Sequence, residues 1–158
     1  MLRIAYLFVI LIAAASAHAK DMSDRDGWVV LPTGKTHEQL VEDVKAAVKD
    51  NGLIVVTQAG PTKAAAARGI TIPANRVIGV FNNDFAVRVL NTSTAAMIEA
   101  PIRLYVTENA DGTATLSYKT PSFVFAPYVD EGGTELEGIA QELDERFDAI
   151  ATSAATSQ

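Results

Sequence analysis

The residues best suited to chemistry gather between Asn82 and Lys119. Arginine and lysine side chains bind carboxylates and other small anions, tyrosine adds a hydroxyl, and asparagine amides can orient the bound group. If the strands that carry these side chains are neighbours in one sheet, the groups converge at one end of it. The predicted ligand-binding residues are Asn82, Asn83, Asp84, Arg88, Arg103, Tyr105 and Lys119.

The same residues also have a structural explanation. Asn82 and Asn83 directly precede an apolar helical pattern, where asparagine caps helices well. Arg103 and Tyr105 fit the solvent-facing side of a sheet, where polar and amphipathic side chains are common. Both interpretations, a site for a small anion and a set of structural residues, remain open at this point.

The composition excludes several common chemistries. The chain has no cysteine, which excludes thiol nucleophiles, thiol redox reactions and thiolate metal sites. It has two histidines, and His18 lies in a predicted leader, so a site with several histidine ligands is excluded as well. His37 falls in the first turn of a predicted helix, away from its apolar stripe, and is expected on the solvated surface. Phosphate loops, dinucleotide fingerprints and nucleophile elbows are absent from the sequence. We therefore assign no catalytic residue and predict no metal and no cofactor.

The N-terminus has the pattern of a secretory leader. A positive start with Arg3 is followed by an apolar run over 4–15 and by the small residues Ala17 and Ala19 around His18. The run is shorter than the roughly 20 residues that a membrane-spanning helix needs. The sequence predicts a signal peptide over 1–19 that is cleaved, and no stable membrane insertion afterwards. The mature protein is then exported, to the periplasm or beyond if the source is bacterial.

The charge balance is acidic. The chain has a formal net charge of −6, and loss of Arg3 with the leader takes it to −7. A nucleic-acid-binding domain usually carries a basic patch, and no basic run occurs here. Nucleic acid is therefore excluded as a partner.

Periodicity predicts one α+β domain over 27–152, between a flexible lead-in over 20–26 and a disordered tail over 153–158. We expect a two-layer fold with a mostly antiparallel sheet of about 4–5 strands, packed against two main helices plus short helices. Strands are predicted at 27–31, 53–58, 76–81, 102–107 and 113–119, and the main helices start at Thr36 and near Thr134.

Three local patterns support this arrangement. Thr36 and Gln39 have the spacing of a capping box, and Asn51-Gly52 is a typical helix end. Apolar and polar residues alternate over 102–107, as they do in a strand with one buried face. The loop 109–112 ends in glycine and predicts a hairpin.

The segment 121–128 combines aromatic residues with two prolines, which argues against a central strand. One interpretation is a lid over the sheet edge or the core. The other is an extended partner surface, because exposed aromatic residues favour protein contacts. The predicted interface residues are Phe123, Phe125 and Tyr128.

The order of these motifs resembles the family called domain of unknown function 302, over roughly 27–151. The resemblance is carried by the capped first helix that ends at Asn51-Gly52, then by LIVV at 53–56, RVIGVFN at 76–82, APIRLYV at 100–106, and Asp111-Gly112 before LSY at 116–118. The chain departs from the family pattern at two places. After the third strand, where members carry a glycine- or asparagine-proline step, it has Asn82-Asn83 without a proline, and before the fourth strand, where members carry leucine-proline, it has Ala100-Pro101. The segment 58–60 also lacks a histidine that many members carry. The resemblance implies a compact α+β domain with an antiparallel sheet and a tendency to dimerise, and it implies no established activity.

Two classes of function follow from the sequence. The first is a non-catalytic exported module that binds a small ligand, such as a small anion, or a partner protein, with a homodimer among the expected assemblies. The second is a small hydrolase or isomerase-like enzyme. It would use Asp84 or a carboxylate of the acidic segment 129–133 for proton transfer, with Arg103 stabilising charge. The lack of any local catalytic constellation favours the first class.

Overall fold

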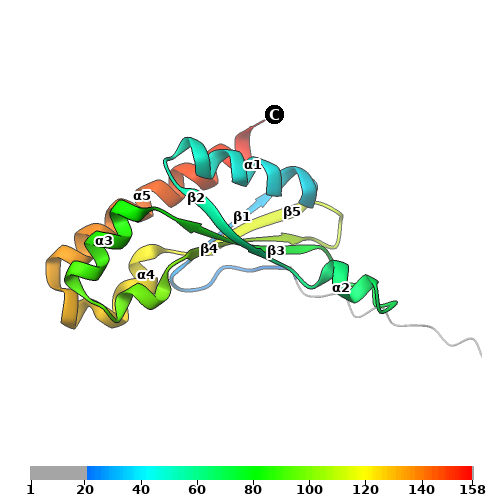
Figure 1. Ribbon diagram of the computed structural model, residues 1–158. Helices are drawn as coiled ribbons and strands as arrows, with labels where there is room; N and C mark the ends of the chain where they lie inside the picture. Colours follow the sequence, from blue (N-terminus) through cyan, green and yellow to red (C-terminus); the bar gives the residue numbers. More distant parts are fainter. Residues whose placement is uncertain (1–20, 158) are drawn as a thin grey trace, which may run out of the picture.

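The computed structural model describes residues 21–157, so the predicted signal peptide lies outside the described part of the chain. The described elements follow one another in this order (Figure 1): β1 (Trp28–Thr33), α1 (His37–Asp50), β2 (Ile54–Ala59), α2 (Thr62–Ala66), β3 (Asn75–Phe81), α3 (Asn83–Thr92), the 3-10 turn η1 (Ala96–Glu99), β4 (Ile102–Glu108), β5 (Ala114–Lys119), α4 (Pro121–Phe125), the 3-10 turn η2 (Ala126–Tyr128) and α5 (Val129–Thr156).

The strands form one antiparallel sheet in the order β1-β5-β4-β3-β2. Figure 1 shows α1 and α5 lying over one face of the sheet, with α3 beside α5. The blue segment 21–27 passes on the other side. The predicted fold class, a two-layer α+β domain with an antiparallel sheet, is confirmed. We call the sheet face away from α1 and α5 the outer face.

The core lies between the sheet and the helices. Along β4, Ile102, Leu104 and Val106 are buried, whereas Arg103 is exposed and Tyr105 is half-buried. This alternation places every second side chain of β4 on the outer face, as the sequence pattern predicts. From the helical layer, the apolar stripe of α1 and the inward face of α5 complete the same core cluster.

Local signals set the ends of the first helix. The Thr36 hydroxyl accepts a hydrogen bond from the Gln39 amide, and the Gln39 side chain accepts one from the Thr36 amide, which confirms the capping box. After the helix, Gly52 has a φ of +74°, a left-handed conformation that glycine adopts without strain. The chain can therefore turn directly from α1 into β2.

The β4–β5 hairpin turns where the sequence predicts. Asn109 donates its amide to the Thr113 carbonyl at 2.8 Å, and Gly112 donates to the Asn109 carbonyl at 3.0 Å. Gly112 has a φ of +84°. This turn fixes the register of the two strands that carry Arg103, Tyr105 and Lys119.

The extended conformation expected in the partner-surface interpretation of 121–128 is wrong. The segment is helical, because Pro121 occupies the first turn of α4 and the Thr120 hydroxyl caps it by accepting from the Phe123 amide at 3.2 Å. The acidic segment 129–133, which precedes the predicted helix start near Thr134, also belongs to a helix. A local break at Gly133, with φ of +60° and ψ of −159°, divides α5 near its start.

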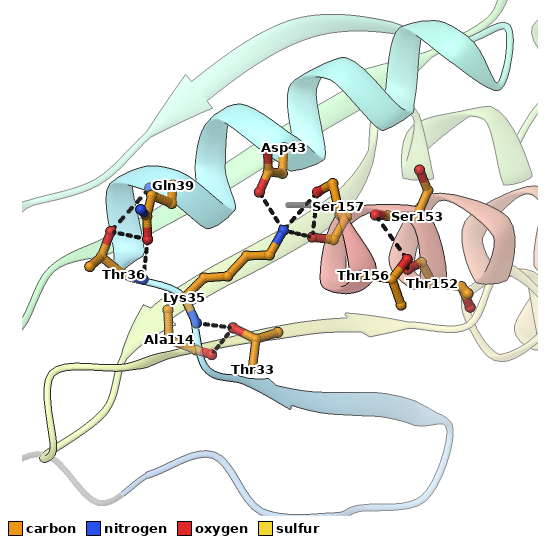
Figure 2. A network of polar contacts seen from close by, with 11 residues as sticks. Thr33, Lys35, Thr36, Gln39, Asp43, Ala114, Thr152, Ser153, Thr156 and Ser157 are labelled. Atoms are coloured by element: carbon orange, nitrogen blue, oxygen red, sulfur yellow. Dashed lines mark hydrogen bonds and ion pairs between the residues drawn. The ribbon is translucent and has the colours of Figure 1, made fainter.

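The predicted disordered tail over 153–158 is wrong for its first four residues, because α5 continues to Thr156 and Ala154 is buried. Figure 2 shows the contact that holds this end in place. The Lys35 ammonium group donates to the Asp43 carboxylate at 2.5 Å, to the Ala154 carbonyl at 2.8 Å and to the Ser157 hydroxyl at 2.7 Å. A cation at a helix C-terminus satisfies carbonyl groups that lack a partner within the helix.

Among the helices of residues 21–157, none is both long and apolar enough to cross a membrane.

Candidate ligand-binding cavity

Two cations lie directly opposite each other on the outer face. Strand pairing aligns Trp28 with Lys119 across β1 and β5. Leu104 pairs with Tyr118 across β4 and β5, and the same antiparallel register, continued by one residue, sets Arg103 opposite Lys119. Side chains opposite each other in an antiparallel pair point to the same face. Trp28, Lys119 and Arg103 therefore form one row across three adjacent strands.

This row borders an open cavity with a volume of about 980 Å³. Side chains from the middle of the sheet line it, among them Val77 and Tyr105. One side is lined by the helical segment after β5, with Phe123, Val124 and Pro127, and another by the chain between β2 and α2, with Gly60 and Pro61. The cavity combines a largely apolar lining with the two cations, a composition typical of small-molecule sites.

One carboxylate shares the cavity with the cations. Glu99 is held from one side by the Tyr128 hydroxyl, which donates to Glu99 Oε1 at 2.8 Å. On the other side Arg103 Nη2 lies 3.8 Å from Glu99 Oε2. The hydrogen bond to Glu99 raises the pKa of Tyr128 above its ordinary value, so the phenol remains a donor. Glu99 is thus fixed at the edge of the cavity.

Lys119 has a different environment. Within residues 21–157 no carboxylate forms an ion pair with it. Its ammonium group lies 5.7 Å from the ring centre of Trp28, which also has the Arg25 guanidinium at 5.1 Å. Cation–ring contacts at exposed sites contribute about 0.5–1 kcal/mol each. The positive charges of Lys119 and Arg103 are therefore only partly compensated by the protein itself.

The remaining predicted ligand-binding residues lie elsewhere. Asn82 caps α3, because its Oδ1 accepts from the amides of Asp84 and Phe85 at 2.9 and 3.1 Å. Asn83 and Asp84 are exposed in the first turn of α3. Arg88 makes a two-pronged ion pair with Glu142 of α5, at 2.7 and 2.6 Å.

These four residues do not line the outer-face cavity. The structure thus brings together Arg103, Tyr105 and Lys119, and places Asn82, Asn83, Asp84 and Arg88 on α3 and at its start. The step from β3 into α3 leads the chain toward the helical layer, where α3 packs on α5.

The predicted interface residues are also divided. Phe123 is 45% exposed and lines the cavity, whereas Phe125 is 3% exposed and belongs to the core. Tyr128 packs against the core and directs its hydroxyl to Glu99. The three rings do not form one continuous exposed surface, because their backbone is helical rather than extended.

A model of the family described as "Domain of unknown function DUF302" matches residues 29–154. The chain belongs to this family. The fold is similar to a crystal structure described as an uncharacterized conserved DUF302 protein from Bacillus stearothermophilus, with a TM-score of 0.73 and 20% sequence identity. The match covers 82% of this chain and 99% of the other. No curated protein matches the chain.

Three residues that line the cavity of this DUF302 chain were not predicted from the sequence as ligand-binding residues. Trp28 was predicted only as part of a strand, and its position beside Lys119 depends on the pairing of β1 with β5, which are far apart in sequence. Glu99 lies in η1 and had no motif to mark it. Phe123 was predicted as an interface residue. The continuous apolar run over 28–31 gave no signal for the face on which Trp28 lies.

His37 differs from its predicted solvated position. It is half-buried, and its Nε2 atom is buried without a hydrogen-bond partner among the described residues. Burial, followed by the charge of Arg76, lowers the pKa of His37 below its ordinary value. His37 lies outside the cavity lining, and within residues 21–157 no group of three or more His, Cys, Asp or Glu side chains is arranged to hold a metal ion.

A second cavity is much smaller. It has a volume of about 40 Å³ and lies in the core among Leu53, Phe85 and Phe147. Such a volume accommodates little more than a water molecule. The outer-face cavity is therefore the candidate site.

Proposed function

We propose that this chain is a non-catalytic binding module that holds a small organic anion in the outer-face cavity. The observation that supports the proposal is the position of Arg103 directly opposite Lys119 on the lining of a large, mostly apolar cavity. Like charges opposite each other destabilise a sheet. An anion bound between them would remove that repulsion and form charge-assisted hydrogen bonds.

The experiment is a thermal-shift screen of residues 20–158 with acetate, octanoate and phenylacetate. A bound ligand stabilises the folded state, and a concentration of about 100 times Kd adds about 2.7 kcal/mol, which corresponds to a Tm increase of roughly 5–10 °C for a domain of this size. We expect Arg103→Gln and Lys119→Gln to remove the increase. Lys49→Gln is the matched control, because Lys49 is an exposed cation of α1 outside the cavity. No increase with any probe, or an increase that both cavity variants retain, would overturn the proposal.

We further propose that the mature protein works outside the cytoplasm, in the periplasm or as a secreted protein if the source is bacterial. The leader pattern over 1–19 supports this proposal. The test is the mass of the protein recovered from the exported fraction of expressing cells. A chain that starts near Lys20 supports export, and an intact chain confined to the cytoplasm contradicts it.

The catalytic alternative has less support from the geometry. Asp84 and the carboxylates of 129–133 do not line the cavity, and Glu131 accepts a hydrogen bond from the Ser93 hydroxyl. None of these carboxylates forms an ion pair with Arg103 within residues 21–157. Glu99 is the carboxylate near Arg103, and it is held by Tyr128.

A homodimer remains a second proposal, with one observation in its favour. β2 is an edge strand of the sheet, and its Ile54 and Val56 side chains are 59% and 45% exposed. Edge strands with exposed apolar side chains often pair with another chain. Light scattering after size exclusion tests this, with Val56→Lys expected to dissociate a dimer. A monomer at all concentrations would contradict the proposal.

A further inference from the structure

Building on the proposed function, we infer that the cavity selects apolar monocarboxylates over dianionic phosphates, and that Glu99 is the residue that sets this preference. The inference rests on the charges that border the cavity, on the way Glu99 is held, and on the apolar surface beside the cations. It goes beyond the proposed function because it names the class of anion.

The charge count is the first step. The cavity lining contains two cations, Arg103 and Lys119, and one carboxylate, Glu99. Its net charge is therefore +1. A monoanion neutralises this charge. A phosphate monoester with nearly two negative charges gains more from the two cations, but it brings its excess charge close to Glu99 and loses more hydration on entering the site. Like charges brought together in a partly dehydrated site disfavour binding.

The second step is that Glu99 is held at the cavity. Its side chain is 26% exposed, and its two oxygens are engaged separately, one by the Tyr128 hydroxyl at 2.8 Å and the other by the more distant Arg103 guanidinium at 3.8 Å. The shorter contact comes from a neutral donor. Glu99 therefore stays beside the cation row, and Arg103 retains donors for a second carboxylate.

The third step concerns the rest of the ligand. Phe123 is 45% exposed on the cavity wall, and Val124 and Pro127 lie on the same wall. On β1, which pairs with the strand of Lys119, the Trp28 ring already contacts the Lys119 ammonium group. An apolar body attached to the carboxylate would cover Phe123 and exclude water from the cation row. The arrangement fits an aromatic or branched apolar carboxylate better than a bare inorganic anion.

The experiment compares two probes of similar size, phenylacetate and phenyl phosphate, by calorimetric titration at about pH 8, where the phosphate is dianionic. We expect the native protein to bind phenylacetate at least about tenfold more tightly, since the dianion loses more hydration on entering the site and its second charge meets Glu99. Glu99→Gln should shift the affinity ratio toward phenyl phosphate by about tenfold. Asp50→Asn, at the exposed end of α1, is the control and should leave the ratio unchanged.

The outcomes separate the two proposals. Binding of both probes with a preference for phenyl phosphate, or a ratio unaffected by Glu99→Gln, overturns the role of Glu99 and leaves the proposed function standing. Binding of neither probe overturns the inference, and it also overturns the proposed function if acetate and octanoate fail to bind as well. If Glu99→Gln fails to fold, the ratio measured on the native protein still decides the preference.

The contact between Phe123 and the apolar part of the ligand has its own test. Phe123→Ser should weaken phenylacetate binding severalfold and leave acetate binding nearly unchanged, because acetate lacks the body that covers the ring. Equal losses for the two carboxylates would show that Phe123 does not contact the apolar body, and would overturn that part of the inference.

Discussion

The opposed cations give a prediction that needs no ligand. In the double-mutant cycle of Arg103→Gln and Lys119→Gln, we expect the coupling between the two side chains to be unfavourable in the ligand-free protein. Directly opposite residues have Cα atoms about 4.5–5.5 Å apart, so the flexible charged ends lie roughly 6 Å apart on average. At that separation the Coulomb repulsion is about 0.7 kcal/mol in water and about 2.8 kcal/mol at an effective dielectric constant of 20.

The Arg103 side chain is 62% exposed, so the aqueous limit applies more closely. Physiological salt, with a Debye length of about 8 Å, roughly halves the interaction. The expected coupling is therefore about 0.3–0.7 kcal/mol in moderate salt and larger in low salt. The cycle cancels the separate contacts of each cation, such as that of Lys119 with Trp28.

The assay is urea unfolding followed by circular dichroism, at about 0.02 M and about 0.5 M salt. Because each single substitution relieves the repulsion, the double variant should gain less stability than the two single variants together predict. A favourable coupling, or one that does not change with salt, would refute the reasoning. It would mean that the two charges point apart or are already bridged.

Three further predictions concern the fold. Lys35→Met should lower the free energy of unfolding by about 1–3 kcal/mol and speed amide exchange over 154–157, because it removes hydrogen bonds from a cation that is 15% exposed; normal exchange at that helix end would contradict this. Asn82→Ala should cost about 1 kcal/mol in urea unfolding, since Asn82 accepts from two amides of α3, whereas Asn83→Ala should cost much less. The pKa of His37 is lowered in the folded protein, so the unfolded chain takes up its proton first as the pH falls. Stability should therefore decrease below about pH 6.5, and His37→Gln should reduce this decrease; an unchanged pH profile would show that the site is solvated.

The strands and the first main helix could be predicted from local patterns. Alternation over 102–107 gave the buried and exposed sides of β4, and the turn at Gly112 fixed its partner. The capping box at Thr36 gave the start of α1. Each of these signals acts within a few residues, which is why sequence alone revealed them.

The cavity was predicted only in part, because it depends on contacts between distant segments. Arg103 and Lys119 share a hairpin, so their proximity was within reach of the sequence. Trp28 joins them through the pairing of β1 with β5, and the Glu99 contact with Tyr128 spans two short helical segments. The segment of Phe123 was expected to be extended, yet the Thr120 cap and Pro121 start a helix there. Short helices of this kind are set by packing as much as by propensity.

The most direct test of the central claim is a titration of the isotope-labelled protein with phenylacetate, followed by amide and side-chain NMR. The account predicts that the largest shifts fall on Arg103, Lys119 and Phe123, and that Arg103→Gln abolishes them. Shifts that cluster instead on α3 around Arg88, or their absence at saturating probe, would contradict a binding site on the outer face.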